Sequence, residues 1–154
     1  MSLSTTRKLD FFYNSFGRGD LRFWVDGETA LSYPSRTGSV SAVSGLVNAC
    51  PIGTRYLCDG PADPVPDEAD TMFVVEKPGK PWKIRLWPYP VPPGHAKVDG
   101  ILIHPDGSKG HQKDGNGTMG CIGTLDNAEE LRIFLLGHFA NPDADCIAVE
   151  INRI

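Results

Sequence analysis

The sequence contains no run of about 18 apolar residues, which excludes an ordinary membrane-spanning helix. It also contains no block of basic residues: 15 Lys and Arg stand against 19 Asp and Glu, for a net charge of −4. We therefore expect neither nucleic acid nor an anionic membrane surface as a partner. No apolar stretch follows the basic pair Arg7 and Lys8, so we expect no Sec signal peptide in this chain.

Cysteine is scarce, with four residues and no CxxC pair among them. Cys50 and Cys58 are close enough in sequence to close a short disulfide loop in an oxidising compartment, and the sequence leaves this open. Cys146 lies in an apolar strand pattern, which predicts a small buried hydrophobic side chain.

Helix signals are also few, whereas the 17 glycines and 13 prolines divide the chain into short segments. We expect one mainly β domain over residues 1–154, with residues 1–19 as a flexible or accessory segment. Residues 35–47 and the acidic, proline-rich segment 59–70 are expected to be loops. Alternating or buried apolar patterns predict strands at Leu21–Val25, Glu28–Tyr33, Gly53–Cys58, Met72–Glu76, Trp82–Trp87, Gly100–His104 and Cys146–Asn152.

Two local signals sharpen this prediction. Asp26-Gly27 is typical of a tight hairpin turn between the first two strands. A single helix is predicted over Asn127–Leu136, with Asp126 as its cap, Gly137 as its stop, and Leu131, Phe134 and Leu135 at helical spacing.

The chemistry is concentrated in two motifs. Ile101-Leu-Ile-His104 places a histidine at the end of an apolar strand, and Thr118-Met-Gly-Cys121-Ile-Gly places a cysteine in a glycine-rich turn. A neutral imidazole takes a thiol proton, and the resulting thiolate attacks amide or ester carbonyls. Small residues such as Gly120 let backbone N–H groups approach a developing oxyanion. A backbone carbonyl or the Asp106 carboxylate could hold the imidazole in the useful tautomer.

These motifs resemble the signature of the L,D-transpeptidase (YkuD-like) catalytic domain: a histidine, a spacer, then Ser/Thr-His-Gly-Cys. Cys50-Pro-Ile-Gly-Thr-Arg-Tyr56 is similar to a Pro-x-Gly-x-Tyr segment of the same family. The resemblance covers residues 20–154 and implies a β-rich α+β, YkuD-like β-sandwich with one helix after the cysteine. Met119 stands where the family usually has histidine, and Gly123 where it has Asn or Arg. In this the chain is similar to compact phage-encoded members and to peptidoglycan-directed effectors delivered between bacteria.

The resemblance implies that Cys121 attacks a peptidoglycan stem peptide between a diaminopimelate-type residue and the terminal D-alanine. His104 would be the base, and the amides around Gly120 and Cys121 would hold the oxyanion. His111 is a second candidate for the base, but His104 is preferred because a strand end holds it rigidly. The remaining candidates for substrate contact are Thr118, Met119, Asp106, His111, Trp87 and Tyr89.

No cofactor or metal is implied by this reading. An immunity or secretion partner would fit an effector, which would be made in the cytoplasm and act in the periplasm or cell wall by a non-Sec route or phage lysis. Two alternatives stay open: a non-catalytic phage or wall-binding member of the same fold, and a zinc site formed by His104, His111 and Cys121.

Overall fold

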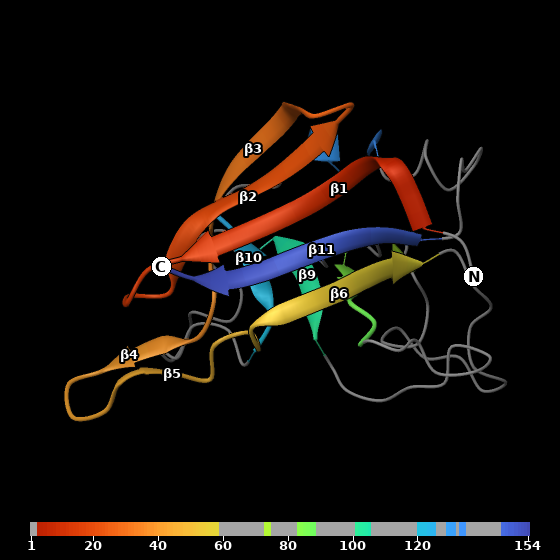
Figure 1. Ribbon diagram of the computed structural model, residues 1–154. Helices are drawn as coiled ribbons and strands as arrows, with labels where there is room; N and C mark the ends of the chain where they lie inside the picture. The colour runs from red at the N-terminus through yellow and green to blue at the C-terminus, as the bar shows by residue number, and fades with distance from the viewer. Residues whose placement is uncertain are drawn as a thin grey trace, which may run out of the picture.

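The computed structural model describes residues 3–58, 73–74, 83–88, 101–105, 120–125, 129–131, 133–134 and 146–154. Nine strands in this part of the chain form one curled sheet in the order β6-β11-β1-β2-β3-β10-β9-β8-β7, and β4 pairs with β5 as a separate hairpin (Figure 1). The strands are β1 Leu3–Tyr13, β2 Arg18–Val25, β3 Glu28–Arg36, β4 Ser39–Ser41, β5 Gly45–Val47, β6 Gly53–Cys58, β7 Phe73–Val74, β8 Lys83–Arg85, β9 Leu102–Pro105, β10 Ile122–Thr124 and β11 Cys146–Arg153.

The mainly β class predicted from the sequence is confirmed, and the hairpin turn shows why the local signal was sufficient. Asp26 and Gly27 join β2 to β3 with φ angles of 51° and 82°. Positive φ at both central residues matches the right-handed twist of the flanking strands, and Asp-Gly adopts it at little cost. The turn therefore sets the register between β2 and β3, which pairs Val25 with Glu28.

Residues 3–19 belong to the β1–β2 hairpin of the large sheet, so the expectation of a flexible or accessory segment there was wrong. β1 lies between β11 and β2, parallel to the first and antiparallel to the second. Its inward side chains Leu9, Phe11 and Tyr13 alternate with outward ones and are buried. On the outward side, the buried Asp10 carboxylate accepts hydrogen bonds from Arg22 Nε at 2.7 Å and Trp24 Nε1 at 2.9 Å.

Residues 35–47 are not a loop throughout, which is a second correction. Ser39–Ser41 and Gly45–Val47 pair antiparallel as β4 and β5. The hairpin projects from the curled sheet (Figure 1) and leaves Val40 and Val43 exposed, so no buried apolar face marks it in the sequence. Its two strands are held by backbone pairing, which composition does not reveal.

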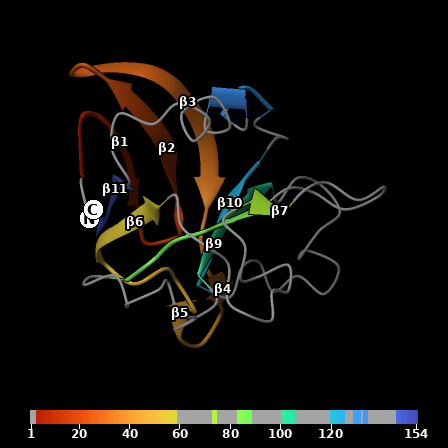
Figure 2. The ribbon, with the colours of Figure 1, turned by 90° about the vertical axis from the view of Figure 1, so that its right-hand side faces the viewer.

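The sheet curls so that β6, at one end, meets the residues after β8, which is next to last at the other end. Tyr56 N–H donates to Trp87 O at 2.9 Å, and Trp87 N–H donates to Tyr56 O at 2.8 Å. This bridge joins β6 to the residues that follow β8. In Figure 1, β9 and β10 lie behind β6 and β11, and the side view in Figure 2 separates the two layers.

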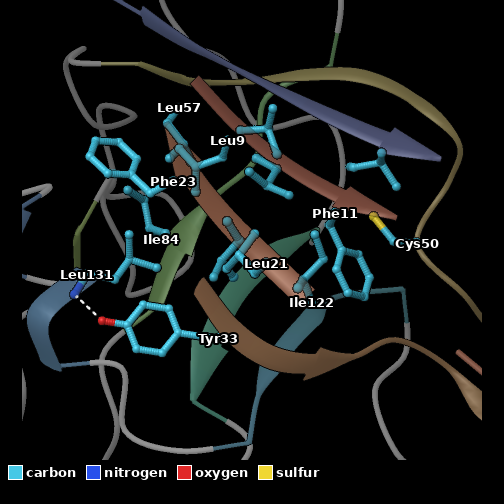
Figure 3. Packing of buried hydrophobic residues seen from close by; sticks show 14 of the residues in the cluster. Leu9, Phe11, Leu21, Phe23, Tyr33, Cys50, Leu57, Ile84, Ile122 and Leu131 are labelled. Carbon is cyan, nitrogen blue, oxygen red and sulfur yellow. Dashed lines mark hydrogen bonds between the residues drawn. The ribbon is translucent and has the colours of Figure 1, made fainter. Parts of the chain in front are cut away.

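The space between the layers is filled by one apolar cluster drawn from both of them (Figure 3). Ile103 and Ile122 enter it from β9 and β10, and Leu57 enters it from β6. Each is fully buried, and burying such a side chain contributes about 1.5–3 kcal/mol. The strands that carry the catalytic candidates are therefore fixed by the core itself.

The predicted helix is present in the described part of its range, at residues 129–131 and 133–134. Leu131 is fully buried, and its N–H donates to Tyr33 Oη at 3.1 Å (Figure 3). Phe134 is half-exposed and touches the core from one side, with its ring 5.8 Å from that of Phe23. The cap at Asp126, the stop at Gly137 and the side chain of Leu135 lie outside the described residues.

Candidate active site

The two catalytic candidates are brought together by neighbouring parallel strands. β9 and β10 pair so that Ile103 is opposite Ile122 and His104 is opposite Gly123. Ile103 and Ile122 both point into the core. Side chains alternate along a strand, so His104 and Gly123 belong to the other face, and Cys121 lies at a bend directly before β10, two residues from Gly123. The pairing thus places the turn that carries Cys121 next to the strand that carries His104.

The imidazole of His104 is held in one orientation. It is 4% exposed, and its Nδ1 lies 3.0 Å from the carbonyl oxygen of Pro105. A carbonyl oxygen only accepts hydrogen bonds, so Nδ1 carries the proton and Nε2 of the neutral ring is the basic nitrogen. Of the two orienting groups considered from the sequence, the structure provides the backbone carbonyl.

The thiol of Cys121 has the exposure that a nucleophile needs. Cys121 is partly exposed and is not disulfide-bonded. It directly precedes β10, whose three residues are all buried. Gly123 adds no side chain beside the His104 ring, whereas the Asn or Arg usual in the L,D-transpeptidase signature would extend from that position.

Gly120 shapes the turn that presents the thiol. Its φ of +89° is unfavourable for any residue with a Cβ, and a Cβ there would lie 2.9 Å from Ile101 Cδ1. Its N–H donates to the carbonyl oxygen of Asn48 at 2.7 Å. This corrects the oxyanion role expected for Gly120, because its amide is engaged elsewhere in this structure. The same role for the Cys121 amide stays a prediction.

Thr37 is a site residue that the sequence did not indicate. It is 1% exposed, and its Oγ1 donates to the carbonyl oxygen of Cys121 at 2.8 Å. Thr37 Oγ1 also accepts a hydrogen bond from the N–H of Cys50 at 2.7 Å. A single threonine before a glycine has no distinguishing pattern, so only the tertiary structure identifies it.

Trp87 lies in the core, which corrects its expected place in a substrate groove. It is 2% exposed and packs with Cys146 and Tyr56 at the point where the sheet closes. Its backbone pairs with that of Tyr56, so the residue lies where β6 meets the chain after β8.

The cysteine pairing differs from the one that the sequence left open. Cys146 is buried, as predicted, but it is disulfide-bonded. Cys50 and Cys121 are not, and the backbone of Cys58 is directly opposite that of Cys146 in the register of β6 and β11. A Cys50–Cys58 loop is therefore excluded. An extended strand rises about 3.3 Å per residue, so β6 carries Cys58 away from Cys50.

Cys50 is instead buried beside Tyr13, whose hydroxyl donates to the Cys50 carbonyl oxygen at 3.1 Å. Burial raises the pKa of the Tyr13 phenol, the Cys50 thiol raises it further, and Arg153 lowers it. The phenol therefore stays protonated at neutral pH and keeps its hydrogen bond to the carbonyl oxygen of Cys50, which shortly precedes β6.

The other predicted site residues lie outside the described residues: Asp106, His111, Thr118, Met119 and Tyr89. The choice between His104 and His111 as base therefore stays a prediction, as does the zinc alternative that includes His111. Among the residues that the structure describes, no group of three or more His, Cys, Asp or Glu is placed to hold a metal ion. Within the same residues, no helix has the length and apolarity to cross a membrane.

No family model matches this chain, and neither a curated protein nor a solved structure matches it.

Proposed function

We propose that this protein is a cysteine-dependent acyl transferase or hydrolase that acts on peptidoglycan stem peptides, as an L,D-transpeptidase or L,D-carboxypeptidase does. The observation that supports the proposal is the parallel pairing of β9, which carries His104, with β10, which Cys121 directly precedes. The substrate class comes from the resemblance of residues 101–104 and 118–122 to the L,D-transpeptidase signature.

The resting geometry supports a defined set of proton transfers. Nε2 of His104 takes the thiol proton as Cys121 Sγ attacks the carbonyl that precedes the terminal D-alanine. The C–N bond then breaks, and the imidazolium gives its proton to the departing amine of D-alanine. The stem peptide remains on Cys121 as a thioester. An amine resolves it by transpeptidation or exchange, and water resolves it by carboxypeptidation.

The disulfide at Cys146 supports the proposed place of action. Disulfides persist in oxidising compartments such as the bacterial periplasm and are rare in the cytosol. A protein that works on the cell wall meets such conditions, and its disulfide forms once it has left the cytoplasm. We accordingly place its action in the periplasm or cell wall, with an immunity or secretion partner as part of the effector hypothesis.

The test is incubation with defined muropeptides and mass spectrometry of the soluble products. Wild-type protein should release D-alanine from tetrapeptide stems or exchange it for an added D-amino acid. His104→Ala and Cys121→Ala should do neither, whereas Thr29→Val, on the exposed part of β3, should match wild type. Binding to peptidoglycan without any product would favour the non-catalytic alternative. Activity lost to a chelator and restored by zinc would favour the metal alternative.

A further inference from the structure

Two residues far from Cys121 in sequence hold the turn that carries it, one on each side. The Gly120 N–H donates to Asn48 O at 2.7 Å, which fixes the peptide before Gly120. The Cys121 carbonyl accepts from Thr37 Oγ1 at 2.8 Å, which fixes the peptide after Cys121. Thr37 precedes the β4–β5 hairpin and Asn48 follows it, so both hydrogen bonds come from the base of a single hairpin.

The Thr37 hydroxyl bridges Cys121 and Cys50 in this arrangement. Its proton goes to the Cys121 carbonyl and a lone pair accepts the Cys50 N–H at 2.7 Å. Because the hydroxyl has one proton, and the Cys121 carbonyl only accepts, that proton is used for Cys121 and Oγ1 meets Cys50 as an acceptor. The hydrogen-bond geometry therefore defines the rotamer of Thr37.

The Thr37 backbone is anchored as firmly as its side chain. Its N–H donates to Gly17 O at 2.8 Å, and Gly17 packs so closely on the Thr37 carbonyl that a Cβ there would collide with it. Gly17 lies in the turn between β1 and β2, the central hairpin of the large sheet. Thr37 thus links the turn between β1 and β2 to the backbone of Cys121 through two hydrogen bonds.

We propose that Thr37 is a positioning residue for Cys121: its hydroxyl sets the direction of the Cys121 backbone and so aligns the thiol with His104. The proposal rests on the proposed function for the roles of Cys121 and His104. Thr37 touches neither substrate nor sulfur in this role. It acts through the main chain, and its loss should reduce the assistance that the imidazole gives to thiol ionisation.

The test uses alkylation of the intact protein by iodoacetamide, with Cys121 and Cys50 followed separately by peptide mass spectrometry. Thr37→Val removes the hydroxyl and keeps the shape, Thr37→Ser restores it, and Thr29→Val controls for the change of residue type. At pH 7 we expect alkylation of Cys121 in Thr37→Val to be at least about 10-fold slower than in wild type, because only the thiolate reacts. Thr37→Ser should stay within about 3-fold for the same reason.

The pH profile separates positioning from a general structural effect. At pH 9.5 the difference between Thr37→Val and wild type should shrink to about 2-fold, because thiols then ionise without help from a base. Equal rates at pH 7 would overturn the proposal, as would a difference that is the same at both pH values. Alkylation of the buried Cys50 in Thr37→Val would also overturn it, because the hydroxyl would then be holding the core together.

Should Thr37→Val fail to fold, Thr37→Ala takes its place with the same expected and contrary results. These rates need no substrate, so they are independent of the muropeptide assay. The expected alkylation pattern without muropeptide products would refute the proposed function and leave the role of Thr37 standing. Muropeptide turnover that Thr37→Val leaves unchanged would refute the role of Thr37 alone.

Discussion

His104 lies directly opposite Gly123 in the parallel pair of β9 and β10. Gly123 contributes no side chain, and the residue two positions before it is Cys121. This register holds the backbone of His104 beside β10 and places the turn of Cys121 next to β9. Its Nδ1 contact with Pro105 O assigns Nε2 as the basic nitrogen.

Replacing the thiol should abolish turnover and preserve the fold. Cys121→Ala removes the nucleophile, and Cys121→Ser supplies a hydroxyl that the imidazole activates far less well at neutral pH. Both should lower kcat by at least about 10³-fold. Cys50→Ala is the matched control, because it removes a thiol from the core and should stay active. Residual turnover in Cys121→Ala, measured on muropeptides, would exclude Cys121 as the nucleophile.

Gly120→Ala should cost about 1–2 kcal/mol of stability, because φ is +89° there and a left-handed conformation penalises a Cβ by that amount. Ile101 Cδ1 can rotate away from the new methyl group, so the backbone accounts for most of the cost. Gly27→Ala is the control, with φ of +82° and no atom within 4 Å. Urea denaturation should give similar losses for the two variants, and only Gly120→Ala should lose activity. Full activity in Gly120→Ala would show that the turn does not need this conformation.

Reducing the disulfide should lower the free energy of unfolding by about 2–4 kcal/mol, since a long loop is released in the unfolded chain. Cys58→Ala and Cys146→Ala should each show this loss, and the double variant should show it once, because they remove the same bond. Thermal melts with and without dithiothreitol provide the measurement. A melting temperature of the wild type that does not respond to dithiothreitol would contradict the pairing.

The raised pKa of Tyr13 predicts that the free energy of unfolding falls at alkaline pH. Its pKa in the folded protein is raised above 10.0, mainly by burial, so the unfolded chain releases the phenol proton first. The stabilisation is complete below pH 10 and is lost as the pH rises from there through the folded-state pKa. Tyr13→Phe should be less stable at neutral pH by about 1 kcal/mol, for the lost hydrogen bond, and should decline less above pH 10. Urea denaturation at several alkaline pH values is the measurement, and the same decline above pH 10 in Tyr13→Phe as in wild type would contradict the role of this phenol.

Local signals predicted much of the fold. The strand Gly53–Cys58 was predicted with its observed bounds, and the turn at Asp26-Gly27 sets the adjoining hairpin. β1 was missed, although its apolar residues Leu9, Phe11 and Tyr13 lie at alternate positions. Charged residues near the start of the chain favoured the interpretation as a flexible or accessory segment. The β4–β5 hairpin was missed because it buries no continuous apolar face.

For the site, the sequence indicated His104 and Cys121 as candidates, and their roles stay predictions. The orientation of His104 depends on Pro105, its neighbour in sequence, and was therefore within reach of local reasoning. Thr37 and the partner of Cys146 depend on which strands lie side by side, which a single sequence does not encode in any short pattern. The burial of Trp87 has the same origin, because it follows from the closure between β6 and the end of β8.

The most direct test of Cys121 as an acylated nucleophile is the mass of the protein after brief exposure to tetrapeptide stems and acid quenching. Wild type should gain the mass of a stem peptide that has lost its terminal D-alanine, and peptide mapping should locate it on Cys121. Cys121→Ala should gain nothing, and Cys50→Ala should match wild type. Absence of this adduct in wild type, together with unchanged stem peptides in solution, would contradict acyl transfer through Cys121 and leave a wall-binding protein.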